Sequence, residues 1–237
     1  MTQHYRLSRR DFLKASGTTV IGMALGACAT AQVSEAPVRN ADEALQRLME
    51  GNQRYSANKS IDLNESQSRR VEMAKGQNPF ATIFSCVDSR VPPELVFDRG
   101  LGDLFVIRTA GHVIDNAVLG SLEFGVAELK IPLLMVMGHE KCGAVKATVE
   151  AVEHNATAEA EINWLVDGIR PAVEKAKTQS GDLLDNAVRA NVALTVEQLK
   201  RSSILSEALK KGELKIVGAR YDLDTGIVEV GEWLAKN

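Results

Sequence analysis

Cysteine, histidine and aromatic residues are all scarce in this chain of 237 residues. It has three cysteines and four histidines, and Phe, Trp and Tyr together make up 5% of the sequence. Three cysteines can form at most one disulfide, which excludes a secreted fold held together by several disulfide bridges. So few aromatic side chains also leave little material for a groove that stacks nucleic-acid bases.

Basic residues do not outnumber acidic ones. The formal net charge is −3, with 28 Lys and Arg against 31 Asp and Glu. Four of the basic residues and only one of the acidic ones fall within the first 31 positions, so the rest of the chain is more acidic than the total suggests. No cluster of Lys and Arg follows these positions. Because nucleic acids are bound through basic surfaces, the sequence predicts no nucleic-acid partner.

A basic segment and a short apolar run open the chain. Residues 8–14 (SRRDFLK) resemble a twin-arginine export signal, and residues 15–27 are small, weakly apolar and free of acidic side chains. That run is well below the ~20 residues that a membrane-spanning helix needs. We therefore interpret residues 1–31 as a twin-arginine (Tat) signal peptide, which predicts export of the folded protein through the Tat translocase to the periplasm.

The end of this leader fits two kinds of processing. Residues 25–28 (LGAC) fit a lipobox, and residues 29–31 (ATA) fit a signal-peptidase site. Lipid on Cys28 would anchor the protein to the membrane as a lipoprotein, whereas cleavage after Ala31 would release it into the periplasm. The sequence leaves both open, and the soluble form is the preferred interpretation.

The remaining chain is predicted to be a linker followed by one α/β domain. Residues 32–40 show no periodicity and are interpreted as the linker, and residues 41–237 as the domain. Short apolar runs predict buried strands at 80–87, 104–108, 133–138 and 214–219. Apolar spacing and end signals predict helices near 40–55, 116–130 and 182–211. This alternation predicts a mostly parallel central sheet flanked by helices.

Side chains suited to a metal follow two of the predicted strands. Cys86, Asp88 and Arg90 follow one strand, and His139 and Cys142 follow another. Sites in open α/β sheets form where strands give way to loops, so these side chains are expected to meet. Two thiolates and one imidazole suit Zn²⁺. Three protein ligands leave one tetrahedral position open, which is typical of a catalytic zinc site.

The two motifs together, Cys-x-Asp-Ser-Arg and His-x-x-Cys-Gly, resemble those of the β-class carbonic anhydrases. The similarity extends from about Ala41 through Glu229. It implies the β-carbonic anhydrase fold and the zinc-dependent, reversible hydration of carbon dioxide (CO₂) to bicarbonate and a proton. It also implies that Cys86, His139 and Cys142 bind the zinc.

The same resemblance gives roles to five further residues. Asp88 and Arg90 would form a catalytic dyad, in which the guanidinium holds the carboxylate so that it accepts a hydrogen bond from the attacking hydroxide. In a closed state, Asp88 would itself become a zinc ligand. Around the substrate, Gln77 would orient CO₂ or bicarbonate, Phe105 would line an apolar pocket, and Gly143 would follow the third ligand.

Several positions near the site depart from the family's usual pattern. Phe124 stands where an aromatic hydroxyl is usual, Thr109 and His112 replace asparagines, and Ala144 replaces a glycine; Arg108 matches the family's arginine near the site. No metal ligand or dyad residue is replaced. The changes keep hydrolysis of carbonyl sulfide or carbon disulfide as an alternative activity. His112 is interpreted either as a proton shuttle or as a hydrogen-bonded loop residue.

The resemblance also implies a homodimer or a higher homo-oligomer. The amphipathic helix predicted near residues 40–55 carries Leu45, Leu48 and Met49 on one face. We expect this helix to pack over the partner subunit, because an exposed apolar face of this size needs to be covered.

The metal site is predicted to be open at neutral pH. In the family's switchable subtype, a tryptophan and a glycine just before the first cysteine help to form a second bicarbonate pocket, which favours the closed state. Those positions hold Ile83 and Ser85 here. Two interpretations of the site without catalysis remain: a structural zinc site closed by Asp88, and a module that holds zinc or senses bicarbonate.

Overall fold

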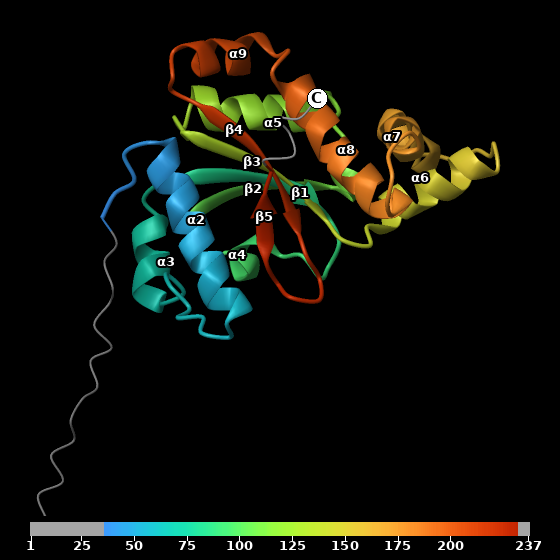
Figure 1. Ribbon diagram of the computed structural model, residues 1–237. Helices are drawn as coiled ribbons and strands as arrows, with labels where there is room; N and C mark the ends of the chain where they lie inside the picture. The colour runs from blue at the N-terminus through green and yellow to red at the C-terminus, as the bar shows by residue number, and fades with distance from the viewer. Residues whose placement is uncertain (1–35, 232–237) are drawn as a thin grey trace, which may run out of the picture. The chain divides into compact units, whose positions relative to one another are not determined.

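A five-stranded sheet lies at the centre of residues 36–231, the part of the chain that this computed structural model describes (Figure 1). The strands are β1 (Ala81–Cys86), β2 (Leu104–Thr109), β3 (Leu133–His139), β4 (Lys215–Tyr221) and β5 (Val228–Val230). Their order is β2-β1-β3-β4-β5, with the first four parallel and β5 antiparallel to β4. The four strands predicted from apolar runs are the four parallel strands, and the predicted fold class is confirmed.

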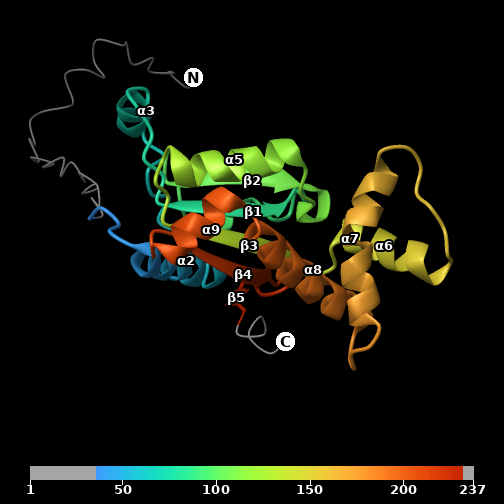
Figure 2. The same ribbon diagram turned by 90° about the horizontal axis from the view of Figure 1, so that it is seen from above.

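Helices cover both faces of the sheet (Figures 1 and 2). They are α2 (Ala41–Ser56), α3 (Gln67–Met73), α4 (Pro93–Val96), α5 (Asn116–Ala127), α6 (Gly143–Glu153), α7 (Ile162–Ala176), α8 (Leu183–Leu199) and α9 (Ser203–Lys210), with a short 3-10 helix η1 (Ala110–His112). One face packs against α2 and α4, and the other against α5, α8 and α9. α6 and α7 pack with α8 in a third apolar cluster, which includes Cys86 and Cys142.

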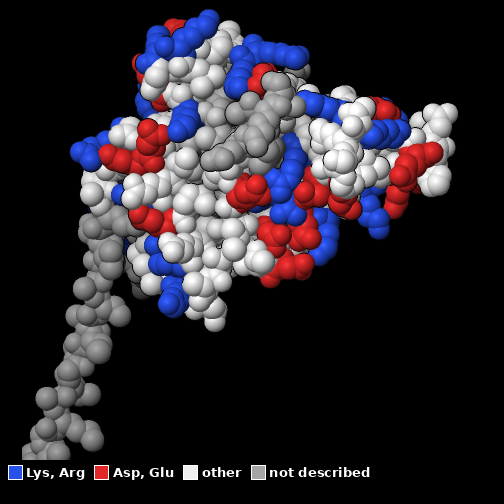
Figure 3. Space-filling view, viewed as in Figure 1, with Lys and Arg blue, Asp and Glu red and all other residues white. Residues whose placement is uncertain are grey.

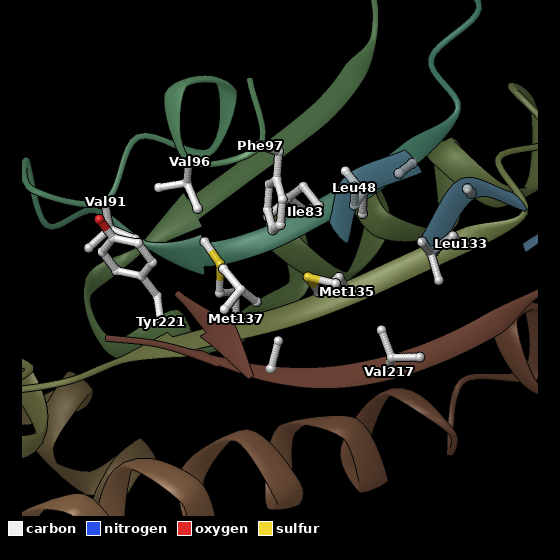
Figure 4. Close-up of a cluster of buried hydrophobic side chains, with 14 residues drawn as sticks. Leu48, Ile83, Val91, Val96, Phe97, Leu133, Met135, Met137, Val217 and Tyr221 are labelled. Atoms are coloured by element: carbon white, nitrogen blue, oxygen red, sulfur yellow. The ribbon is translucent and has the colours of Figure 1, made fainter. Parts of the chain in front are cut away.

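The central strands are buried on both faces. Ile83 and Met135 point to the face covered by α2 and α4 (Figure 4), whereas Phe84 and Leu134 belong to the cluster on the other face. All residues of β1 and β3 are buried. This double burial explains why the strands are continuous apolar runs instead of alternating patterns.

The apolar face of α2 covers this chain's own sheet. Asn40 caps the helix by accepting a hydrogen bond from the Glu43 amide at 2.9 Å. Leu48 is fully buried, and Leu45 and Met49 are half-buried against the same cluster. β1, β3 and α4 of the same chain contact α2, so its apolar face does not depend on a partner for cover. Packing of α2 over a second subunit stays a prediction.

The long helix predicted near 182–211 is two helices. Asp182 caps α8, and Ser202 caps α9 by accepting a hydrogen bond from the Leu205 amide at 3.2 Å. Because the Ser202 side chain can cap the first turn of a new helix, the chain turns between the two segments. α9 then ends before Gly212, which has a left-handed φ of 70°.

The surface of the described region mixes both signs of charge. On the face shown in Figure 3, Lys and Arg side chains lie interspersed with Asp and Glu. Among residues 36–231, no helix is long and apolar enough to cross a membrane. The predicted leader, with both of its processing sites, lies outside the described residues.

Gly51 allows α2 to approach the α4 segment closely, and replacing it should destabilise the protein. A Cβ at Gly51 would overlap the carbonyl oxygen of Phe97. Gly51→Ala should therefore lower the free energy of unfolding by about 1–3 kcal/mol, measured by chemical denaturation. Gly120→Ala is the control, because a Cβ on this α5 glycine meets nothing within 4 Å; it should stabilise by about 0.5–1 kcal/mol. Equal effects of the two changes would contradict the close packing of α2.

Candidate metal centre

Three side chains suited to a metal meet at the carboxyl end of the sheet. Cys86 ends β1 and His139 ends the adjacent parallel strand β3, while Cys142 is the residue before α6. Their ligand atoms all lie within 4.8 Å of one another, and all three residues are buried. The sulfurs of Cys86 and Cys142 are 3.9 Å apart, and both cysteines are free thiols.

The geometry of this group fits a tetrahedral zinc ion. Two sulfurs bound at 2.3 Å to one tetrahedral zinc are about 3.8 Å apart, close to the observed spacing. His139 Nδ1 donates a hydrogen bond to the carbonyl oxygen of Glu140 at 2.9 Å, which leaves Nε2 as an unprotonated acceptor. Nε2 is buried and has no hydrogen-bond partner. A buried nitrogen lone pair that converges with two sulfurs is a donor set that a metal ion binds.

The two thiols are tightly coupled. The contact with Cys142 lowers the pKa of the Cys86 thiol, and the hydrogen bond from the Gly111 amide acts in the same direction. The same contact, together with burial, raises the pKa of Cys142. The two thiols therefore titrate as one coupled pair. A divalent cation that displaced their protons would take both residues as thiolates.

Asp88 lies beside the cluster, held by Arg90. Arg90 donates from Nε to Oδ1 at 2.9 Å, from Nη2 to Oδ2 at 2.7 Å, and from its backbone amide to Oδ1 at 3.0 Å. These bonds hold the pKa of the Asp88 carboxyl well below its usual range. Its Oδ2 lies 3.8 Å from His139 Nε2, which is beyond hydrogen-bond distance. The carboxylate is therefore ionised and turned toward Arg90.

Arg108 shapes the loop that carries the dyad. From β2, its Nε donates to the carbonyl oxygen of Cys86 at 2.8 Å. Its Nη2 donates to the carbonyl oxygens of Asp88 at 2.7 Å and Val91 at 3.2 Å. One guanidinium thus fixes the backbone at three points of the loop. Sequence reasoning placed Arg108 near the site but could not identify its partners, because they are backbone carbonyls.

Arg108→Lys should weaken metal binding even though it keeps the positive charge. A lysine ammonium cannot reproduce the planar fork that holds three carbonyls, so the loop after Cys86 should lose its fixed geometry. We expect a fall in zinc affinity of about 10–100-fold, measured by competition with a chelator. Arg220→Lys is the control, because Arg220 pairs with Asp185 and Asp222 and contacts no ligand. Unchanged affinity in Arg108→Lys would contradict the clamp.

A buried polar group lies behind Cys86. In η1, the Gly111 amide donates to the Cys86 sulfur at 3.4 Å. His112 is 2% exposed, and its Nδ1 lies 3.2 Å from Thr195 Oγ1. Burial lowers the pKa of His112 to about 4, so the ring is neutral at physiological pH. Of the two interpretations of His112, the structure favours the hydrogen-bonded loop residue over the proton shuttle.

The predicted substrate-binding residues are not all brought to the cluster. Gly143 follows Cys142 as the exposed first residue of α6. Phe105 pairs with Thr82, four residues before Cys86 along β1, which is roughly 13 Å of strand. Gln77 is exposed and precedes β1, at the opposite end of the strand from Cys86. Within one chain, Gln77 and Phe105 are therefore separated from the ligands.

Two of the positions that depart from the family pattern lie beside apolar or aromatic side chains. Phe124 is 49% exposed and its ring lies 6.5 Å from that of Phe105. Ile83 is fully buried with Val91 and Tyr221 in the cluster shown in Figure 4. Apolar side chains thus fill the region around the position where the switchable subtype has its tryptophan.

A mostly parallel α/β sheet with a Cys-His-Cys group at its carboxyl end defines the β class of carbonic anhydrases. The family model for carbonic anhydrase matches residues 81–228, and the chain belongs to this family. It is thus an enzyme that catalyses the reversible hydration of CO₂, and it belongs to a class that depends on zinc.

Curated relatives and solved structures agree with this assignment. The chain is 40% identical over 195 residues to a carbonic anhydrase of Mycolicibacterium smegmatis, covering 82% of this chain and 95% of that one. It is 42% identical over 191 residues to carbonic anhydrase 2 of Mycobacterium tuberculosis, covering 80% and 92%. The β-carbonic anhydrase CcaA matches with a TM-score of 0.64 and 26% identity over 81% and 97% of the two chains. Coccomyxa β-carbonic anhydrase in complex with acetazolamide matches with a TM-score of 0.60 and 27% identity over 78% and 85%.

Proposed function

We propose that this carbonic anhydrase works with one zinc ion held by Cys86, His139 and Cys142, with Asp88 and Arg90 as its catalytic dyad. The observation that carries the proposal is His139 Nε2, which is buried without a partner and lies within 4.8 Å of both sulfurs. The donor set contains no carboxylate, so a fourth, exchangeable position remains for the reaction.

The ligand chemistry makes the neighbouring dyad necessary. When bound, zinc supplies a Lewis acid that turns water into a nucleophile near neutral pH. Two thiolates cancel the formal charge of the ion, so this donor set acidifies water less than three neutral imidazoles would. The protein must therefore help to hold and orient the reacting oxygen.

Asp88 provides that orientation. Because Arg90 donates three hydrogen bonds to it, the carboxylate stays ionised and can only accept further hydrogen bonds. Accepting the proton of the nucleophile would direct an oxygen lone pair at the carbon of CO₂. The same three bonds keep Asp88 from becoming a fourth ligand, which favours the open site over a closed, purely structural one.

Direct assay of the zinc-loaded protein tests this function. Stopped-flow hydration of CO₂ should give kcat/KM in the range of about 10⁴–10⁸ M⁻¹s⁻¹. A paired assay with carbonyl sulfide and carbon disulfide should show much slower hydrolysis. Faster turnover of either sulfur compound would make this chain a hydrolase of that substrate. Stoichiometric zinc without any CO₂ hydration would favour the sensing module.

A second copy of the chain would complete the substrate pocket. Gln77 and Phe105 lie away from the ligands of their own chain, so the roles that the family resemblance gives them require the site of a partner. Val87, the residue before Asp88, is 52% exposed, and Leu95 of α4 is 57% exposed. A partner subunit would cover such side chains. We therefore propose a homodimer or a higher homo-oligomer with Gln77 and Phe105 acting across the interface.

Two impaired variants should complement each other when mixed. Cys142→Ser lacks a metal site but retains Gln77, whereas Gln77→Ala retains the metal site. If Gln77 acts on the partner's site, each mixed dimer contains one complete site. Random exchange of subunits should then restore about a quarter of wild-type activity. If Gln77 serves its own chain, no mixed dimer has a complete site, and activity should stay at the sum of the two variants.

We propose that the protein acts in the periplasm after Tat export, with lipid anchoring at Cys28 as the alternative. Residues 8–14 support export of a folded chain, which would carry its thiolates into an oxidising compartment already shielded by metal. Replacing Arg9 and Arg10 by lysine should retain the protein in the cytoplasm. Intact mass of the mature chain separates the two forms: a start at Gln32 supports the soluble form, and a diacylglyceryl group on Cys28 supports the lipoprotein.

A further inference from the structure

Asn191 is a buried polar residue on α8, directly behind the metal centre. Its side chain is surrounded by apolar helix packing, and the residue is 5% exposed. α8 lies very close to β3, since a Cβ at Gly138 would come within 2.7 Å of the Val192 side chain. A buried amide is costly unless it is hydrogen-bonded, so the bonds of Asn191 indicate what it does there.

The Asn191 amide holds the residue that donates to a ligand sulfur. Its Nδ2 donates to the carbonyl oxygen of Gly111 at 2.9 Å and lies 3.4 Å from His112 Nε2. The amide of the same Gly111 donates to the Cys86 sulfur. Gly111 has a left-handed φ of 62°, and a Cβ there would lie 2.6 Å from Ile169 Cδ1. Ile169 of α7 and Asn191 of α8 thus fix the position of Gly111, and its amide faces the Cys86 sulfur.

We propose that Asn191 is a positioning residue for the metal centre, which aims the Gly111 N–H at the Cys86 sulfur. The inference rests on the proposed ligation of the metal by Cys86. A hydrogen bond to a ligand thiolate draws electron density from the sulfur and so tunes the metal that it binds. His112 completes the arrangement: with Nδ1 donating to Thr195 Oγ1, its Nε2 accepts the second proton of the Asn191 amide.

Loading the full-length Asn191→Leu variant with Co²⁺ in place of zinc tests this role. Leucine keeps the side-chain volume but releases the Gly111 carbonyl, so the Cys86 sulfur should become more electron-rich and less well placed. We expect the sulfur-to-Co²⁺ charge-transfer band to move to longer wavelength and the Co²⁺ affinity to fall about 10-fold. The matched control is Asn52→Leu. Asn52 is 2% exposed and bonds to the backbone of Val96, Gly226 and Val228, away from the ligands. This control should lose stability but keep the wild-type band.

A measurement on the wild-type protein keeps the proposal testable if Asn191→Leu does not fold. In ¹⁵N-labelled protein loaded with ¹¹³Cd²⁺, the Gly111 amide should show scalar coupling to cadmium across the N–H···S hydrogen bond. Absence of this coupling, or a folded Asn191→Leu with an unchanged band and affinity, would overturn the role of Asn191. Failure of the wild-type protein to bind Co²⁺ or Cd²⁺ would instead overturn the metal site itself.

Discussion

Cys142→Ser should abolish stoichiometric zinc binding and lower kcat/KM for CO₂ hydration by at least about 10⁴-fold. The loss is large because Cys142 is one of the three proposed protein ligands, and without the ion the pKa of the reacting water rises back to that of bulk water. Its sulfur also lies 3.9 Å from that of Cys86, and this contact lowers the pKa of the Cys86 thiol. Removing it therefore disturbs two ligands at once. The measurement combines zinc content by mass spectrometry with stopped-flow assay.

Cys28→Ser is the matched control for this change. Cys28 is the third cysteine of the chain and belongs to the predicted leader. Its replacement should leave both zinc content and activity at wild-type values. If Cys142→Ser kept one zinc per chain and activity within tenfold of the wild type, the proposed ligand set would be wrong.

Arg90→Ala should separate metal binding from catalysis. The change removes the two hydrogen bonds from the guanidinium to Asp88 and keeps only the one from the backbone amide of residue 90. Asp88 lies beside the cluster, with Oδ2 3.8 Å from His139 Nε2. The freed carboxylate can then turn onto the metal and close the site. We expect one zinc per chain to remain while kcat/KM falls by about 10²–10³-fold. Arg170→Ala is the control, because Arg170 pairs with Asp167 on the surface of α7.

A second variant shows whether Arg90 acts through Asp88. Asp88→Asn cannot close the site as a carboxylate and also loses the acceptor that orients the nucleophile. If the two residues form one unit, the double variant should be no worse than the more damaged single variant. Additive losses would mean that Arg90 and Asp88 contribute independently. Wild-type activity in Arg90→Ala would remove the dyad from the mechanism.

The ligands and the sheet could be predicted from the sequence because both depend on patterns among residues that are close together in the chain. Each parallel strand is a continuous apolar run, and Cys86 and His139 come where such runs end. Strand ends of a parallel sheet meet in space, so the convergence of ligands follows from topology. The Asp88 and Arg90 pair also lies within three residues of sequence, where a turn brings the side chains together.

The supporting contacts could not be predicted, because they join distant segments through the backbone. Arg108 reaches three carbonyl oxygens, which carry no sequence signature. Asn191 contacts Gly111 across 80 positions of sequence. The apolar spacing of α2 indicated that one face would be covered, and we expected a partner to cover it, whereas the structure places Leu48 against its own sheet.

Two separate observations support the prediction that the site is open. Asp88 is tied to Arg90 by three hydrogen bonds, and it does not belong to the cluster of possible ligands. The region around Ile83 is filled by apolar side chains, including Phe97 and Leu48 (Figure 4). A ligand shifts an equilibrium only through different affinities for the two states. Without a second bicarbonate pocket, bicarbonate should therefore not favour closure.

A crystal structure of the zinc-loaded protein at neutral pH, with anomalous diffraction measured across the zinc edge, tests the central claim most directly. The account predicts one zinc peak bonded to the sulfurs of Cys86 and Cys142 and to Nε2 of His139. It also predicts solvent at the fourth position and Asp88 still paired with Arg90. A zinc ion at any other place, or an Asp88 oxygen within about 2.2 Å of the metal, would contradict it.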